Sequence, residues 1–395
     1  MTIFAFFLFL ATPFSLPLPQ RPEAWVLIVD PGASLFTRFG HSAFLIRAPN
    51  APDEVYDFGH FDFSSRFLKD FLYGHALYSL DTSELEDFVA NYEEERREVR
   101  ALRLTLDPAQ VQDMRKILQK VLQSPEREYR YHHFADNCTT RMRDLIAQIT
   151  YGKWRRFLVA RPSITWRQAL FDVLASNILL KYSLSLVLSI SMDKPRNAWD
   201  GTYLPAQLEH ELLATKGMGT LPDEPFVDRN LVLSPGIRHD RFSVLPAWSF
   251  GLIAVIFAFL TLPLVFFNSR FWLHLAFATI SILQLIIFSI LLFLHLHHEI
   301  CSFNLNIITF FPFLGMLFPL WLGSGTTNFR GIIVVLISAL FPAFVLTLHL
   351  WTIQKTSPFP EVALGLHLLL FIEIALWHLH NRPSKSSKHL LQKMA

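Results

Sequence analysis

The sequence predicts an α+β soluble domain followed by an α-helical membrane bundle of about five spans. Most of the charge of the 395-residue chain lies in residues 20–245, where short β-type runs alternate with amphipathic helical patterns. Residues 246–380 are dominated by Leu, Phe, Ile and Trp, and their apolar runs approach the ~20 residues needed to cross ~30 Å of hydrocarbon. We therefore expect a domain boundary near residue 245.

The first 19 residues predict a signal peptide. They form a short apolar stretch that runs into a Pro-rich segment, although the stretch has no Lys or Arg. An uncleaved membrane anchor is the alternative.

The soluble domain alternates between strand and helix patterns. Predicted strands cover residues 24–29, 42–47, 53–57, 99–106 and 129–134. Predicted helices cover residues 84–95, 108–121 and 139–149. Thr82 or Ser83 is expected to start the first helix, and Asp107 followed by Pro108 is a typical start for the second. This mixture predicts the α+β class.

Cys138 is the only cysteine in the first 300 residues, and it stands where a β-type run gives way to a helix. Asp136 and Asn137 favour helix starts. The positive end of a helix dipole stabilises a thiolate, so Cys138 is a candidate nucleophile. A buried, inert cysteine is the alternative.

His41 is the candidate base, because it precedes a β-type run in a Gly-His-Ser context. A third polar group should orient its ring, with His60 the first choice and Asp57 the second. Papain-type enzymes place the cysteine before the histidine, so the order here suggests a circularly permuted chain with the same site geometry.

Several neighbours of Cys138 could support the site. Backbone N–H groups at the helix start, including that of Cys138, could form an oxyanion hole, and Asn137 is a candidate supporting residue. Arg141 lies three residues on, and could support the site, bind a phosphate or form a plain salt bridge. His132 and His133 should point to opposite faces of their strand.

The sequence gives no sign of a metal, cofactor or nucleic-acid partner. Its histidines show no metal-ligand spacing, and no phosphate-cradling glycine loop occurs. The net charge is +2, without a basic stripe. We therefore expect no cofactor, no metal and no nucleic acid.

The C-terminal part contains candidate membrane spans at residues 247–267, 271–296, 305–322, 331–352 and 362–380. If the soluble domain is outside, the inner segments carry Arg270, Arg330 and the basic tail at residues 381–395, whereas the outer short loops carry only Lys355. This bias favours a cytoplasmic C-terminus.

Several motifs together resemble the Lnb family of bacterial lipoprotein N-acyltransferases. They are residues 39–43 (FGHSA), 56–59 (YDFG), 134–141 (FADNCTTR), 143–145 (RDL), 193–195 (DKP) and 203–205 (YLP), with His298, Asn304, Asn306 and Pro312. The soluble part of that family is related to the permuted papain-like group that includes lecithin:retinol acyltransferase. The segment 179–192 departs from the pattern by being rich in Ser and Leu.

The resemblance implies a multi-pass protein of the bacterial inner membrane with a periplasmic catalytic domain. Its activity would be acyl transfer from a phospholipid, through a Cys138 thioester, to the α-amino group of a lipoprotein's N-terminal cysteine. His298, Asn304 and Asn306 would bind a lipid head group or dock the catalytic domain, or merely cap helix ends. A membrane-anchored cysteine peptidase or amidase acting on cell-wall peptide, and a non-catalytic envelope sensor, are the rival interpretations.

Overall fold

A computed structural model describes residues 16–34, 36–62, 66–174, 178–218, 223–237, 270–302 and 304. The chain divides into two compact units. The first comprises residues 1–71, 75–164 and 196–240, and the second comprises residues 72–74, 165–195 and 241–395. Each unit is described below by itself.

The first unit is built on a seven-stranded antiparallel sheet in the order β6-β4-β3-β2-β1-β5-β9. Its strands are β1 (Glu23–Val29), β2 (His41–Arg47), β3 (Glu54–His60), β4 (Leu77–Glu84), β5 (Val99–Leu104), β6 (Glu128–Arg130) and β9 (Val227–Ser234). The central strands β1 and β2 are buried along nearly their whole length, as expected of strands covered on both faces.

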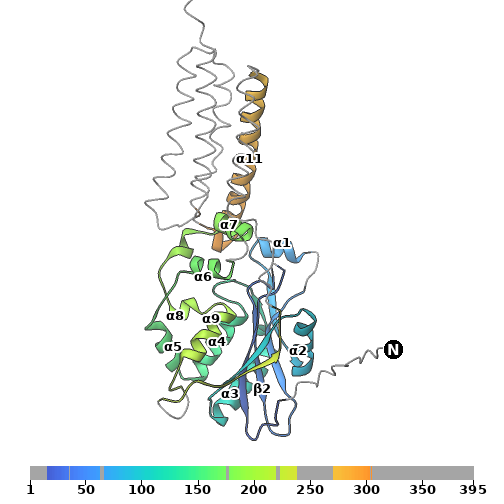
Figure 1. The fold of residues 1–395 in the computed structure, drawn as a ribbon, viewed down its shortest axis with the longest axis vertical. Helices are drawn as coiled ribbons and strands as arrows, with labels where there is room; N and C mark the ends of the chain where they lie inside the picture. The colour runs from blue at the N-terminus through green and yellow to red at the C-terminus, as the bar shows by residue number, and fades with distance from the viewer. Residues whose placement is uncertain are drawn as a thin grey trace, which may run out of the picture. The chain divides into compact units, whose positions relative to one another are not determined.

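Helices cover both faces of this sheet (Figure 1). The helices of this unit are α1 (Phe67–Leu72), α2 (Leu85–Glu94), α3 (Pro108–Leu122), α4 (Cys138–Ile149), α5 (Lys153–Val159), α8 (Ala198–Gly201) and α9 (Pro205–Ala214). One apolar core joins the sheet to α3, α4, α5 and α9, and the other joins its opposite face to α2. The α+β prediction for the soluble domain is confirmed.

Local sequence signals account for most of these elements. Asp107 caps α3 by a capping box with Gln110, and Pro108 occupies the first helical position. The predicted helix start at Thr82 or Ser83 is one or two residues before the N-cap, Glu84, because both residues belong to β4, which the sequence did not reveal. The predicted strand 129–134 is shorter than expected, since β6 ends at Arg130 and a turn follows.

The second unit contains α6 (Trp166–Val173), α7 (Ile178–Val187), the 3₁₀ turns η2 (Ile190–Asp193) and η3 (Glu299–Cys301), and α11 (Arg270–His297). Residues 165–195, which lie within the expected soluble domain of residues 20–245, cluster with the C-terminal part, and the expected domain bounds stay a prediction. The physical reason for the clustering is hydrogen bonding: the Ser189 amide donates to Ile300 O at 3.0 Å, and Asn304 Nδ2 donates to Leu186 O at 2.6 Å.

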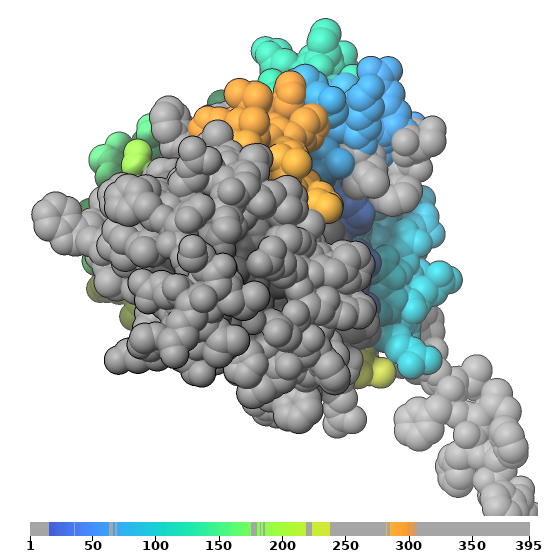
Figure 2. Space-filling model, turned by 90° about the horizontal axis from the view of Figure 1, so that it is seen from above, coloured from blue at the N-terminus to red at the C-terminus, as the bar shows by residue number. Residues whose placement is uncertain are grey.

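Helix α11 covers the second candidate span at residues 271–296. Its exposed apolar side chains include Ile282, Leu285, Ile286, Ile290 and Leu296. Part of the helix is visible at the surface in Figure 2 (orange). Across the residues that the structure describes, no helix qualifies by length and mean hydropathy as a membrane span. The four other candidate spans, residues 1–15 of the predicted signal peptide, the basic tail and Asn306 lie outside the described residues.

Candidate active site

Cys138 is the first residue of α4, and its position is fixed by a capping box. The Asn137 side chain accepts a hydrogen bond from Thr140 N at 2.9 Å, and the Thr140 hydroxyl accepts one from Asn137 N at 2.8 Å. Asn137 Nδ2 also donates to Tyr203 O at 3.1 Å, which ties the helix start to the segment before α9. The predicted helix boundary at Cys138 is confirmed, and of the two residues that favour a helix start, Asn137 is the cap.

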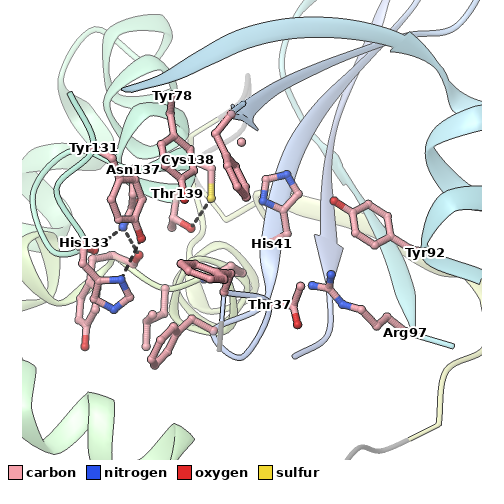
Figure 3. A pocket seen from close by; sticks show the side chains of 18 of the residues that line it. Thr37, His41, Tyr78, Tyr92, Arg97, Tyr131, His133, Asn137, Cys138 and Thr139 are labelled. Atoms are coloured by element: carbon pink, nitrogen blue, oxygen red, sulfur yellow. Dashed lines mark hydrogen bonds between the residues drawn. The ribbon is translucent and has the colours of Figure 1, made fainter. Parts of the chain in front are cut away.

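His41 is the first residue of β2, and a short contact brings this strand to α4. Ser42 Oγ lies 3.1 Å from Thr139 Oγ1, and both side chains are fully buried. The residues on either side of this contact, His41 and Cys138, therefore lie close together, and both line one pocket (Figure 3).

Asp57, on β3, is the group that holds the His41 ring. Its Oδ1 lies 2.7 Å from His41 Nε2 and accepts a hydrogen bond from Gly59 N at 2.6 Å. His60 Nε2 lies 3.6 Å from the other oxygen, Oδ2, and its side chain is almost half exposed. The structure therefore places Asp57, the second choice, against the base, whereas His60, the first choice, contacts the outer oxygen of that carboxylate.

A β-bulge explains this arrangement. In the β3–β4 pairing, Asp57 lies opposite Asp81 and His60 opposite Ser79, so β3 carries one extra residue. A Cβ on Gly59 would lie only 2.2 Å from His41 Cε1 and 3.0 Å from Asp57 Oδ1. Glycine is thus required at residue 59 for the imidazole and the carboxylate to meet.

The charges of this cluster favour a thiolate–imidazolium pair. Burial lowers the pKa of His41, but the charges of Asp57 and Cys138 and the hydrogen bond that the ring donates to Asp57 raise it well above its ordinary value. Burial raises the pKa of Cys138, but the charge of His41 and hydrogen bonds from His41 and Ser42 lower it below its ordinary value. Because Asp57 engages Nε2, Nδ1 is the ring nitrogen left for the thiol.

These shifts predict the pH dependence of thiol alkylation. In a Cys301→Ala background, the rate of Cys138 alkylation by iodoacetamide should rise with a midpoint below the ordinary thiol value of about 8.5. His41→Ala should move that midpoint upward, because it removes the imidazolium that stabilises the thiolate. A midpoint that His41→Ala leaves unchanged would contradict the ion pair.

The pocket that contains Cys138 and His41 has a volume of about 290 Å³. One side consists of aromatic rings, which we call the aromatic wall: Phe36, Phe61, Tyr78 and Tyr131. Ring centroids are 4.8 Å apart for Phe61 and Tyr78 and 4.4 Å apart for Tyr78 and Tyr131. The other side is polar and contains Thr37, Tyr92, Glu95 and Arg97. Figure 3 shows Tyr78 and Tyr131 on one side of Cys138, and Tyr92 and Arg97 beyond His41.

The other residues that were predicted to lie near Cys138 do not all contact it. Arg141 forms a two-point ion pair with Asp136 and lies over the Tyr129 ring, 4.1 Å from its centroid, so the salt-bridge interpretation holds. His132 and His133 do not alternate on a strand, because both lie in the turn after β6. His132 Nδ1 accepts hydrogen bonds from the Phe134 and Ala135 amides, whereas His133 lines the pocket.

Sequence reasoning missed the pocket tyrosines and Arg97. Tyr78 lies on a strand that has no clear alternation, and Arg97 follows α2 after Arg96, which adopts a left-handed φ of 56°. No motif marks any of them. The one available signal in the sequence was the number of tyrosines before and after the His41 and Cys138 segments, at residues 56, 78, 92, 129 and 131.

Two motif residues of the second unit, His298 and Asn304, are among the described residues. Asn304 is buried, and its amide caps the last turn of α7 through Leu186 O, which matches the helix-capping interpretation. The His298 amide donates to Leu294 O at the end of α11. A role in lipid binding or domain docking stays a prediction.

Part of this chain matches a known family model. Residues 19–171 match the family model described as the Lnb N-terminal periplasmic domain. The match includes Cys138, His41, Asp57 and His60, and it supports the Lnb resemblance of the soluble part. Comparisons with curated proteins and with solved structures gave no match.

Proposed function

We propose that the protein is a cysteine-dependent lipoprotein N-acyltransferase. It would move an acyl chain from a phospholipid, through a Cys138 thioester, to the α-amino group of a lipoprotein's N-terminal cysteine. The observation that carries this proposal is the alignment of Cys138, His41 and Asp57 in a pocket with one aromatic side, within residues that match an Lnb domain.

In the first half-reaction, the Cys138 thiolate attacks an ester carbonyl carbon of the phospholipid. A C–S bond forms, the C–O bond breaks, and the His41 imidazolium gives its proton to the leaving oxygen. The products are an acyl-thioester, a lysophospholipid and a neutral His41. Asp57 fixes the ring through Nε2 and stabilises its charged form before this transfer.

In the second half-reaction, a neutral α-amine attacks the thioester carbon. A C–N bond forms, neutral His41 accepts the amine proton, and the C–S bond breaks to release the Cys138 thiolate. The thiolate–imidazolium pair is thereby restored. An amide product requires that water reach the thioester more slowly than the amine does.

Two kinds of donor are available for the oxyanion of both steps. The first turn of a helix leaves its N–H groups without intrahelical partners. In α4, the Asn137 side chain accepts a hydrogen bond from the Thr140 amide, and the Asn137 carbonyl accepts one from the Arg141 amide. The amides of Cys138 and Thr139 are therefore left to donate to the oxyanion. The Tyr78 hydroxyl, in the same pocket, has no hydrogen-bond partner among the described residues. Burial, together with the nearby charge of Cys138, raises the pKa of Tyr78, which keeps it a donor.

Tyr78→Phe should slow thioester formation by about 100-fold or more, because one oxyanion donor is removed while the stacked ring stays. The matched control is Tyr131→Phe. Its hydroxyl, 2.9 Å from His133 Nδ1, is already engaged, so the expected loss is below about tenfold. Acyl-enzyme formation rates measured by intact-mass analysis would test both variants. Equal rates for Tyr78→Phe and wild type would exclude this role for the hydroxyl.

The aromatic wall favours a lipid acyl chain over a peptide. Its four rings offer a continuous apolar surface next to Cys138, and Phe67 and Phe71 pack behind Phe36 with ring centroids 5.5 and 5.8 Å away. Apolar surface of this kind binds an alkyl chain by burial, without hydrogen bonds. A peptide backbone would need polar partners along the same side.

We place the protein in the bacterial inner membrane with the soluble domain in the periplasm. The apolar C-terminal runs, the cationic inner segments and the exposed apolar side chains of α11 support this topology. His298, Asn304 and Asn306 would stabilise the outer-side loop or dock the catalytic domain there. Full acyl transfer by a folded Asn304→Ala/Asn306→Ala protein would exclude a functional role for these two amides.

The proposal is tested by incubating the purified full-length protein with phospholipid and measuring its intact mass. The expected result is an acyl-sized adduct that hydroxylamine removes and that a diacylglyceryl lipopeptide amine converts to N-acyl product. Absence of the adduct, together with cleavage of cell-wall peptide, would instead support the peptidase or amidase.

A further inference from the structure

Arg97 carries an unpaired donor on the polar side of the pocket. The residue is 2% exposed. Its Nε donates to Asp30 O at 2.7 Å and its Nη1 to Glu95 Oε2 at 2.9 Å. Its Nη2 is buried and has no hydrogen-bond partner among the described residues. Arg97 is among the residues that line the pocket of Cys138 and His41, and its guanidinium end lies on the side of Thr37 and His41 (Figure 3).

The guanidinium is held in place from several directions. Its carbon lies 4.8 Å from the centroid of the Tyr92 ring, and the Arg97 amide donates to Tyr92 O at 2.9 Å. A Cβ on Gly32 would lie 3.2 Å from Arg97 Cδ, so the backbone also packs closely against the side chain. A fixed, buried N–H group without an acceptor is costly, and this cost is relieved when a ligand oxygen binds it.

The position of Arg97 indicates which part of a substrate it meets. Tyr92 links it to the base, with the Tyr92 and His41 rings 6.1 Å apart, whereas the aromatic wall lies on the other side of Cys138 (Figure 3). The attacking amine must approach on the His41 side, because His41 takes its proton. Arg97 therefore borders the path of the acceptor.

The charges around Arg97 indicate which kind of ligand oxygen would accept the hydrogen bond from Nη2. Glu95 already compensates the positive charge of Arg97 through Nη1. Asp57 adds a further negative charge near His41. A second anion, such as a phosphate, would meet these carboxylates, whereas a neutral carbonyl oxygen would accept the free N–H without repulsion.

We propose that Arg97 binds the acceptor, with Nη2 donating to the carbonyl oxygen of its N-terminal residue. This oxygen belongs to the group attached to the same α-carbon as the reacting amine, so one hydrogen bond would place the amine beside the thioester. A nearby guanidinium would also disfavour protonation of that amine. The inference rests on the proposed acyltransferase function and assigns it a preference for amines that carry an α-carbonyl.

The test uses full-length acyl-enzyme, preloaded from phospholipid and then given one of two acceptors. One is an S-diacylglyceryl-cysteinyl dipeptide, and the other is S-diacylglyceryl-cysteamine, which keeps the lipid, the thioether and a primary amine but lacks the carbonyl. Wild type should favour the dipeptide in kcat/KM by about 10- to 100-fold. Arg97→Lys keeps the positive charge but loses the planar guanidinium with its fixed N–H groups. It should remove most of that preference by slowing only the acyl transfer to the dipeptide.

Arg103→Lys is the matched control, since Arg103 is a paired arginine on β5 outside the pocket lining. It should leave the preference intact. The proposal is overturned if Arg97→Lys slows both acceptors equally, which indicates a structural role. It is also overturned if the variant slows formation of the acyl-enzyme from phospholipid while transfer stays normal, which indicates contact with the donor. Failure of wild type to form an acyl-enzyme would count against the proposed function instead.

Discussion

Cys138→Ala is expected to abolish both the acyl-enzyme and the N-acylated lipoprotein, while the protein stays folded. The substitution removes only the sulfur atom. The capping box of α4 uses the side chains of Asn137 and Thr140 and the backbone, so it does not depend on the thiol. We expect the free energy of unfolding to change by about 1 kcal/mol or less.

The measurement pairs intact-mass analysis in vitro with detection of N-acylated lipoprotein in cells whose copy is replaced. Cys301→Ala is the matched control. Burial raises the pKa of Cys301 to about 12, so this thiol is not a nucleophile at neutral pH and its loss should be harmless. Cells that still acylate lipoproteins with Cys138→Ala would lead us to the sensor interpretation.

Local sequence signals were sufficient for the nucleophile and its helix. A cap residue, a cysteine and an amphipathic run are contiguous in the chain, so their chemistry follows from adjacency. The position of His41 at the start of a strand was accessible for the same reason. The prediction of the α+β class likewise depended on patterns within single elements.

The contacts between residues far apart in the chain could not be predicted from the sequence. Whether Asp57 or His60 contacts His41 depends on one extra residue in β3. The pattern of apolar residues in the sequence does not reveal this β-bulge at Gly59. Tyr78 and Arg97 belong to different elements of the chain. They line the same pocket only because of the order of the strands in the sheet. Residues 165–195 look like any soluble helical segment, and their assignment depends on hydrogen bonds to residues 300 and 304.

Asp57→Asn should lower the rate of acyl-enzyme formation by about 100-fold or more, as loss of the orienting carboxylate does in related triads. An amide can still contact His41 Nε2, but it carries no charge, so the pKa of His41 should fall. The imidazolium that protonates the leaving oxygen would then be lost at lower pH, and the basic limb of the pH–rate profile should shift downward.

His60→Gln is the comparison that separates the two candidates. Its ring lies 3.6 Å from the outer oxygen of Asp57 and is almost half exposed, so we expect a loss below about tenfold and an unshifted basic limb. If His60→Gln instead gave the larger loss, His60 would be the third member of the site, and Asp57 would serve to hold both imidazoles. The order of the two effects therefore decides whether the base is supported by a carboxylate or by a histidine.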